Sequence, residues 1–246
     1  MLKRILVGIT NFGTYHDDYL RRLLSEYFSM GLSLKVLVFS DRWKNLDGFG
    51  TVVVKEVAQD TLSLTWAHRE RFVQHAEEFD YFLYSEDDIL ITKKNVEAWI
   101  AANDALGDCG RVPGFFVKEV GLNARVNYPQ GHPPFHWNGF MERIDGRVFA
   151  KHTNVHSACT MLSKKQLRMA IDSGKYVAPA HGEGRYAVRE LACSGPFVEC
   201  GLEKIIDVTN FDDFCVQHLP ASYIGVLGTQ EEVMRKQIEN LGGRMQ

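Results

Sequence analysis

The chain has 246 residues, of which 45% are hydrophobic and 24% are charged, which is the composition of an ordinary globular protein. Its formal net charge of -3 at pH 7 excludes a general electrostatic attraction to nucleic acid or to anionic membranes. The sequence has no run of about 18 apolar residues, so no transmembrane segment is predicted. Five scattered cysteines without a CxxC pair argue against a disulfide framework and indicate buried free thiols.

The N-terminal segment gives an expectation about location. Met1-Leu2-Lys3-Arg4 leads straight into the strand-like sequence ILVGIT, with no small-residue cleavage site behind it. We therefore expect no signal peptide and a cytoplasmic protein, with at most a peripheral contact at the inner face of a membrane.

Strand-like and helix-like segments alternate in the first third of the chain. Strands are predicted at residues 4–10, 32–40, 51–57 and 81–85, and helices at 19–28 and 65–79. This alternation predicts an α/β fold with a mainly parallel twisted sheet flanked by helices. Ligands of such sheets bind beyond the carboxyl ends of the strands, so the turns after Thr10, Ser40 and Ser85 are the places to look for chemistry.

The rest of the chain is less regular. We predict a helix at 96–106, a strand at 112–120, a loop at 123–137, an extended segment at 147–162 and a helix at 163–173 with Ser163 as its N-cap.

Three successive carboxylates, Glu86-Asp87-Asp88, directly follow the predicted strand 81–85. Their mutual repulsion serves no packing purpose at the end of a strand. Carboxylate oxygens bind Mn²⁺ or Mg²⁺, and such an ion can bridge to a diphosphate and stabilise it as a leaving group. The alternative is a solvated acidic turn, which the position at a strand end makes less attractive.

The acidic triplet resembles the DxD-like motif of GT-A glycosyltransferases, which follows the fourth strand of a nucleotide-binding half. The resemblance implies one GT-A-like domain over 1–246, with a nucleotide-sugar-binding half at about 1–110 and an acceptor and catalytic half at about 111–227. In the tail at 228–246, Val233, Ile238 and Leu241 are scattered among charged residues, which predicts either a fraying surface helix or a mobile flap. It also implies that Asp88 binds the metal and that Glu86, which replaces the first Asp of the motif, lies toward the nucleotide or the metal.

More residues follow from this resemblance. ILVGIT with the next loop looks like the first strand and the loop that meets the nucleotide base, and VLVFSDRW looks like the second strand with its ribose-binding end. The implied nucleotide-binding residues are Thr10, Asn11, Phe12, Asp41, Arg42, Arg69, Glu86 and Asp87. Taken singly, the loop residues are more often turn formers, and an arginine such as Arg69 more often lies on a solvated helix face.

Other parts of the site are implied in the second half of the chain. Many metal-dependent GT-A enzymes complete the metal site with a late histidine, and His218 occupies the corresponding place. His136, Trp137 and Asn138 suit an acceptor platform, because an indole face packs against a sugar ring while polar groups bond its hydroxyls; the alternative is a loop held by buried aromatics. A zinc site at His132 and His136 is disfavoured by the prolines between them.

An inverting enzyme needs a carboxylate that deprotonates the acceptor hydroxyl. In the family this base lies near the start of a helix, and Glu183 or Glu190 occupies such a position, Glu183 being flanked by glycines that allow close approach. We favour inversion over retention.

The function expected from all of this is transfer of a sugar from a nucleotide diphosphate sugar, with UDP favoured, to a glycan or lipid-linked glycan acceptor. The alternatives from other classes are a nucleotidyltransferase or phosphohydrolase that uses the same acidic site, and a non-enzymatic glycan-binding module. The sequence has no GxxxxGK[ST] motif, which excludes a P-loop ATPase or kinase.

Overall fold

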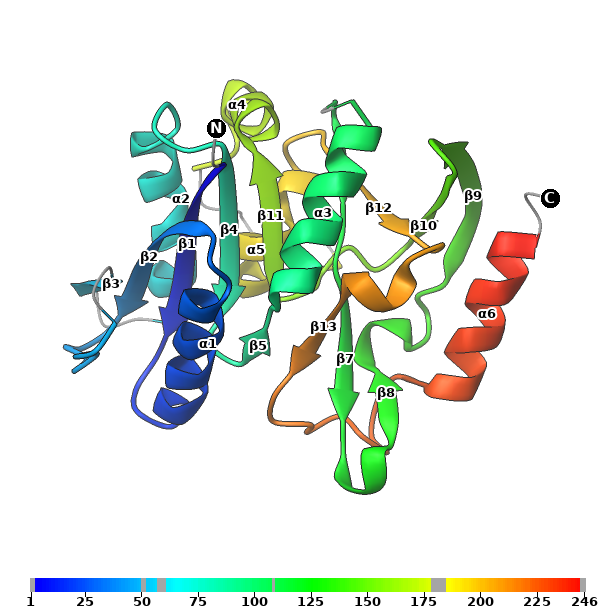
Figure 1. The fold of residues 1–246 in the computed structure, drawn as a ribbon, viewed down its shortest axis with the longest axis horizontal. Helices are drawn as coiled ribbons and strands as arrows, with labels where there is room; N and C mark the ends of the chain where they lie inside the picture. The colour runs from blue at the N-terminus through cyan, green and yellow to red at the C-terminus, as the bar shows by residue number, and fades with distance from the viewer. Residues whose placement is uncertain (1–2, 50–51, 57–60, 108, 178–184, 244–246) are drawn as a thin grey trace. The chain divides into compact units, whose positions relative to one another are not determined.

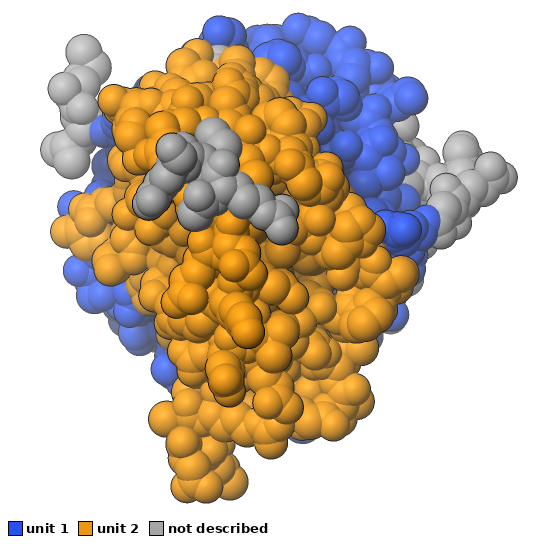
Figure 2. Space-filling view, turned by 90° about the vertical axis from the view of Figure 1, so that its right-hand side faces the viewer, with its two compact units in different colours: residues 1–89, 158–202 blue, residues 90–157, 203–246 orange. Residues whose placement is uncertain are grey.

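The structure is a computed structural model that describes residues 3–49, 52–56, 61–107, 109–177 and 185–243. Among these residues, no helix is both long enough and apolar enough to cross a membrane. Contacts divide the chain into two compact units, residues 1–89 with 158–202 and residues 90–157 with 203–246 (Figure 2). Each unit therefore combines two separate stretches of sequence, whereas the halves expected from the sequence were continuous.

The first unit is an α/β structure, and it contains all four strands predicted in the first third of the chain. Its elements are β1 (Arg4–Asn11), α1 (Asp17–Ser29), β2 (Ser33–Ser40), β3 (Val52–Glu56), α2 (Thr61–Gln74), β4 (Tyr81–Glu86), β11 (Cys159–Ser163), α4 (Lys164–Asp172) and α5 (Val188–Val198). The short strand β5 (Ile89–Leu90) lies where the chain passes to the second unit.

The sheet of the first unit has the strand order β11-β4-β1-β2-β3 (Figure 1). β1 pairs in parallel with β2 and with β4, β2 pairs in parallel with β3, and β11 runs antiparallel to β4. The predicted mainly parallel sheet is therefore confirmed. Because the chain leaves β1 toward β2 on one side and later returns to β4 on the other, the order reverses between β1 and β4.

Close packing of α2 on the sheet depends on a glycine in β1. A Cβ atom at Gly8 would lie 3.1 Å from Cβ of His68 and 3.3 Å from the ring of Phe72, both in α2. Side chains alternate between the two faces of a strand, so Thr10 shares the α2 face with Gly8 while Asn11 points to the opposite face. In Figure 1, α1 lies in front of this sheet and α2 and α5 lie behind it.

The predicted helix boundaries differ in accuracy. Helix α2 begins four residues before the predicted 65–79 segment and ends at Gln74. Helix α4 follows its predicted N-cap, because the Ser163 hydroxyl accepts a hydrogen bond from the Gln166 amide and the Gln166 side chain bonds back to the Ser163 amide. Local capping chemistry was therefore readable from the sequence.

In the part of the chain that the structure describes, the second unit contains two small sheets, two α-helices and three 3-10 segments. Its elements are α3 (Lys93–Ala105), β6 (Arg111–Pro113), β7 (Phe116–Val120), η1 (Leu122–Ala124), β8 (Val126–Tyr128), η2 (Pro129–Gly131), β9 (Trp137–Ile144), β10 (Arg147–His152), β12 (Glu203–Asp207), η3 (Phe211–Phe214), β13 (Cys215–His218), β14 (Thr229–Gln230) and α6 (Glu231–Gly243). One sheet has the order β6-β12-β10-β9, and β14, β8, β7 and β13 are neighbours in the other.

Several predictions in this part of the chain were wrong in detail. The predicted strand 112–120 is two strands, β6 and β7, which belong to different sheets. The predicted loop 123–137 includes β8, and the strand β9 was not predicted. The extended segment 147–162 is two strands, β10 and β11, which belong to different units.

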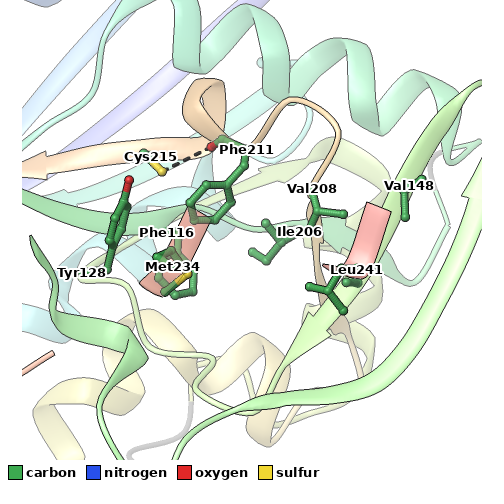
Figure 3. Packing of buried hydrophobic residues seen from close by; sticks show 10 residues of the cluster. Phe116, Tyr128, Val148, Ile206, Val208, Phe211, Cys215, Met234 and Leu241 are labelled. Carbon is green, nitrogen blue, oxygen red and sulfur yellow. Dashed lines mark hydrogen bonds between the residues drawn. The ribbon is translucent and has the colours of Figure 1, made fainter. Parts of the chain in front are cut away.

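The hydrophobic core of the second unit includes side chains of the C-terminal segment (Figure 3). Buried aromatic and aliphatic side chains from β7, β8, β10, β12 and η3 pack together, and Met234 and Leu241 of α6 complete the cluster. Met234 is fully buried and Leu241 is 4% exposed. Residues 229–243 therefore form a short strand and a helix, which is the helical alternative for this segment, and the buried side chains of the helix belong to the core.

Candidate functional site

Two turns of the first unit meet at the carboxyl edge of its sheet. The turn after β1 leads through His16 into α1, and the two-residue turn after β4 consists of Asp87 and Asp88. β1 and β4 are neighbours, and the strand order reverses between them. This is the crevice in which open parallel sheets bind their ligands.

Four side chains form a compact polar group in this crevice. The Nδ1 atom of His16 lies 3.0 Å from Oδ1 of Asp87 and 3.9 Å from Oδ2 of Asp88. The Nδ2 atom of Asn11 donates a hydrogen bond of 2.7 Å to Oδ2 of Asp87. Asp87 is 7% exposed and Asn11 1% exposed, so the group is largely withdrawn from water.

The environment of Asp87 destabilises its ionised form. Burial raises the pKa of Asp87 to about 6, and the charge of Asp88 acts in the same direction. Hydrogen bonds from His16 and Asn11 act in the opposite direction without cancelling the effect of burial. A cation between the two carboxylates would remove this penalty.

The donor atoms suit a divalent cation. One ligand atom from each of His16, Asp87 and Asp88 can be chosen so that all lie within 4.8 Å of one another. Two donors to one Mg²⁺ ion lie at most about 4.2 Å apart, and the distances of 3.0 and 3.9 Å from the His16 nitrogen to the two carboxylates are within this limit. The buried Oδ1 atom of Asn11 has no hydrogen-bond partner in the described part of the chain, and it is a further oxygen donor at this place. An imidazole with carboxylate and amide oxygens is a set that Mn²⁺ accepts.

The turn after β1 is fixed by residues that follow β2. Asp41 accepts a 2.9 Å hydrogen bond from the Gly13 amide, and the Arg42 side chain donates to its other oxygen. The hydrogen bond from Arg42 lowers the pKa of Asp41. The Lys44 ammonium, which is 4% exposed, bonds the Gly13 carbonyl and the Asp17 carboxylate. These contacts fix the backbone conformation of the turn that joins Asn11 to His16.

The structure brings together some of the residues predicted for the site. Asn11, Asp87 and Asp88 belong to the group described above. Glu86 ends β4 but does not belong to this group. Thr10 lies on the α2 face, where its hydroxyl is 3.2 Å from the Tyr84 hydroxyl.

Phe12, Asp41 and Arg42 are the remaining predicted nucleotide-binding residues of the turns. Phe12 is exposed to solvent, whereas Asp41 and Arg42 make hydrogen bonds that support the turn after β1. Phe12 is 48% exposed, in the turn after β1. Asp41 and Arg42 bond to each other and support that turn from the end of β2. Their positions at the carboxyl edge agree with a nucleotide site, and their contact with a nucleotide stays a prediction.

Arg69, which was predicted to bind phosphate, is buried and bonds to backbone carbonyls. It is 1% exposed, and its guanidinium lies between the rings of Trp66 and Tyr176. Its nitrogens donate to the carbonyls of Leu191, Ala192 and Tyr176. We therefore do not include Arg69 in the candidate site.

His218, the predicted second metal ligand, lies at the end of β13 in the second unit. Its Nδ1 atom lies 2.6 Å from Oε1 of Glu119, a carboxylate with no exposed surface. Both oxygens of Glu119 also accept from the Tyr223 amide, and the Tyr223 ring stacks on the imidazole at 5.4 Å. A carboxylate on one ring nitrogen is the usual partner of a metal-binding histidine, and metal binding by His218 stays a prediction.

The predicted acceptor residues lie together at the start of β9. Trp137 packs its ring parallel to Phe116 at 5.9 Å, so it is partly a core residue. His136 and Asn138 are exposed, and the side chain of Asn138 accepts a bond from the Phe140 amide. The aromatic part of the platform is therefore rigid.

The two predicted catalytic carboxylates differ in what the structure says of them. Glu183 lies outside the described residues. Glu190 lies in the first turn of α5, where its Oε2 atom accepts a 2.7 Å hydrogen bond from the Ala187 amide. This bond gives Glu190 a helix-capping role, and its role as a base stays a prediction.

Sequence reasoning missed His16 and Lys44. A signal for His16 was present, because a histidine in the turn after β1 belongs to the same sheet edge as carboxylates after β4. Nothing in the sequence indicated that Lys44 would be buried, since its partners Gly13 and Asp17 become neighbours only after folding.

Comparisons with known proteins do not show a family for this chain. No family model and no curated protein matches the sequence. Among solved structures, one similar chain is a glycosyltransferase involved in the glycosylation of the major capsid of PBCV-1, at 13% identity and a TM-score of 0.42 over 97% of this chain and 99% of that chain. Another is S. aureus TarS 1–349, at 14% identity and a TM-score of 0.47, with 82% of this chain and 57% of that chain covered. At such low identities and TM-scores, neither likeness carries an argument about this protein.

Proposed function

We propose that this protein is a metal-dependent glycosyltransferase of the GT-A type, which transfers a sugar from a nucleotide diphosphate sugar to a glycan or lipid-linked glycan acceptor. We favour UDP as the nucleotide and inversion as the stereochemical outcome. The observation that carries the proposal is the group of His16, Asp87 and Asp88 at the reversal point of a parallel sheet. This position combines a cation-binding donor set with the crevice in which nucleotides bind.

In this proposal the residues of the crevice divide two tasks between them. Asp87, Asp88 and His16 hold Mn²⁺ or Mg²⁺, with the Asn11 amide oxygen beside them. A divalent ion bound there supplies Lewis-acid stabilisation of a leaving diphosphate. Phe12 and the turn fixed by Asp41 border the nucleotide, and an exposed aromatic ring there is able to stack on a base.

The second unit supplies the acceptor side in this proposal. His218 serves as a further nitrogen ligand of the metal, oriented by Glu119. Inversion requires a base that takes the proton of the acceptor hydroxyl, and Glu183 and Glu190 are the two carboxylates proposed for this role.

The test is a thermal-shift screen of the purified protein with UDP, GDP, CMP and CDP, each with and without Mn²⁺. A ligand at about 100 times its Kd adds roughly 2.7 kcal/mol, and each kcal/mol raises the Tm of a protein of this size by about 2–4 °C. We expect a rise of several degrees with one nucleotide, UDP, and only in the presence of Mn²⁺. That nucleotide then selects the sugar donors for a transfer assay.

Asp88→Ala is the decisive variant and Asp172→Ala its control, because Asp172 is an exposed aspartate in the same unit, at the end of α4. We expect Asp88→Ala to lose both the nucleotide shift and transfer activity while keeping its circular dichroism spectrum, and Asp172→Ala to keep all three. Retained transfer activity in folded Asp88→Ala would refute the proposed site. A nucleotide shift with hydrolysis or nucleotidyl transfer but no sugar transfer would favour the phosphohydrolase or nucleotidyltransferase alternative.

A further inference from the structure

The second unit contains a pocket of about 240 Å³ between the start of β9 and helix α6. Its walls include Trp137 and Phe135 on one side and Gln237 and Asn240 of α6 on the other. Sites for drug-sized ligands have volumes of about 300–1,000 Å³, so this pocket fits a smaller molecule, such as a single ring.

The aromatic wall is held in place before any ligand arrives. The Trp137 ring is parallel to Phe116, with 12° between the planes, and His152 meets it edge-on at 5.0 Å. His152 is 6% exposed, and its Nδ1 atom accepts a hydrogen bond from the Asn154 amide. A fixed indole loses little side-chain entropy on binding, and its apolar face suits the C–H face of a pyranose.

The helical wall presents two amide groups. Gln237 and Asn240 are three residues apart, so their side chains lie on the same face of α6. Neither side chain makes a hydrogen bond to another residue that the structure describes, and both are exposed. The buried residues Met234 and Leu241 anchor the helix beside them. Each amide offers both a donor and an acceptor, which is the combination that a sugar hydroxyl requires.

The described residues that line the pocket include no carboxylate, lysine or arginine. Burial lowers the pKa of His152 to about 4, so this imidazole is neutral at pH 7. A diphosphate or a divalent cation would find no carboxylate, lysine or arginine among the lining residues that the structure describes, whereas a neutral hydroxylated ring needs none.

We propose that this pocket binds one neutral pyranose residue of a glycan, with Trp137 against the sugar ring and Gln237 and Asn240 bonded to its hydroxyls. The proposal deepens the proposed function, because it names the chemistry of the acceptor, a neutral glycan, and a part of its site. It assigns two side chains of the C-terminal helix to recognition. Binding of the sugar does not require a nucleotide or a metal.

The experiment is saturation-transfer NMR of the full chain, without nucleotide and metal, against a panel of methyl pyranosides. The panel contains neutral gluco, galacto, manno and N-acetylglucosamine forms, and methyl glucuronide as the charged counterpart. We expect binding of at least one neutral glycoside and none of the glucuronide. The double variant Gln237→Ala/Asn240→Ala is expected to weaken that binding at least tenfold.

The matched control is Lys236→Ala/Glu239→Ala, which alters two exposed residues of the same helix that do not line the pocket. We expect it to bind the sugar as the unaltered protein does. Absence of binding to every neutral glycoside, or equal binding by the Gln237/Asn240 double variant, would overturn the proposal. The double variant should also keep the nucleotide-dependent rise in Tm, so sugar binding without any nucleotide shift would contradict the proposed function and leave this pocket supported.

Discussion

The Nδ1 atom of His16 lies 3.0 Å from an oxygen of Asp87, and this contact joins the turn after β1 to the acidic turn after β4. Asn11 reaches the other oxygen of the same carboxylate. Asp87 is therefore oriented from the neighbouring strand, and the carboxylates meet a nitrogen donor within the first unit itself. The proposed metal site at this sheet edge therefore has a candidate nitrogen donor, His16, that does not depend on His218.

His16→Ala tests this arrangement. We expect the variant to bind Mn²⁺ at least tenfold more weakly, because one donor is lost and the contact that orients Asp87 is lost with it. The free Mn²⁺ concentration, followed by electron paramagnetic resonance during titration, gives the dissociation constant without any activity assay. His75→Ala is the control, since the contacts described for the His75 side chain are with exposed Glu78 and with the ring of Phe79, both in the same unit and outside the candidate site. Equal Mn²⁺ affinity in His16→Ala would exclude His16 from the metal site.

A second variant concerns Glu119 and His218. Glu119 holds one nitrogen of the ring, which favours the tautomer with the proton on Nδ1 and the lone pair on Nε2. Glu119→Gln keeps the shape of the buried group and removes its charge. If His218 binds the metal, loss of this partner should weaken Mn²⁺ binding about 10–100-fold.

The Glu119 prediction has a spectroscopic readout as well. In protein labelled with ¹⁵N at histidine, the chemical shifts of the His218 ring should identify the Nδ1–H tautomer before the substitution and a changed tautomer balance after it. The exposed Glu232→Gln serves as the control in α6. A Glu119→Gln protein that keeps its Mn²⁺ affinity would show that Glu119 only stabilises the fold.

Much of the first unit was predictable because its signals are local. Apolar runs of strand length alternate with helical spacing, and such runs predict buried parallel strands wherever they occur in a chain. The acidic turn after β4 was found in the same way, since its residues are adjacent in sequence. The break between β10 and β11 was missed, although polar residues such as Thr153 and Asn154 interrupt the segment 147–162. Only tertiary pairing assigns its two strands to different units.

Arg69 shows why the structural role of a single residue could not be predicted from the sequence. Pro196 lies inside α5 and has no N–H group, so the Ala192 carbonyl lacks its usual helical partner. The Nε and Nη2 atoms of Arg69 donate to that carbonyl at 3.2 and 3.0 Å. The sequence shows only an arginine in one predicted helix and a proline more than a hundred residues later. The contact in the folded protein shows that Arg69 supplies the hydrogen bonds that Pro196 is unable to donate.

The same contact predicts the effect of Gly195→Ala. A Cβ atom at Gly195 would lie 2.4 Å from Nη2 of Arg69. The guanidinium has little freedom to retreat, because it is buried and its hydrogen bonds to three carbonyls would be lost. We expect a loss of about 1–3 kcal/mol in unfolding free energy, measured by urea denaturation.

Gly242→Ala is the matched control for Gly195→Ala. It also replaces a helical glycine, and nothing lies within 4 Å of the added Cβ atom. We expect it to be neutral or to stabilise the protein by up to about 1 kcal/mol. A Gly195→Ala protein as stable as this control would show that Arg69 is free to move.

The lowered pKa of His152 predicts that the stability of the protein depends on pH. Its pKa is lowered from 6.5 to about 4, mainly by burial and secondarily by the charge of Lys204. Above pH 6.5 the imidazole is neutral in both the folded and the unfolded state and contributes no pH dependence. As the pH falls below 6.5 the unfolded state takes up the proton first, so stability is lost progressively until about pH 4.

From these pKa values, protonation of His152 lowers the unfolding free energy by about 2 kcal/mol between pH 7 and pH 5. His152→Gln removes the titrating group, so its unfolding free energy should fall less over this interval by that amount, whatever its stability at pH 7. Urea denaturation of the two proteins at the two pH values measures the difference. An unchanged pH dependence in His152→Gln would mean that the folded protein protonates His152 as readily as the unfolded chain does, and the pocket beside Trp137 would then carry a positive charge at mildly acidic pH.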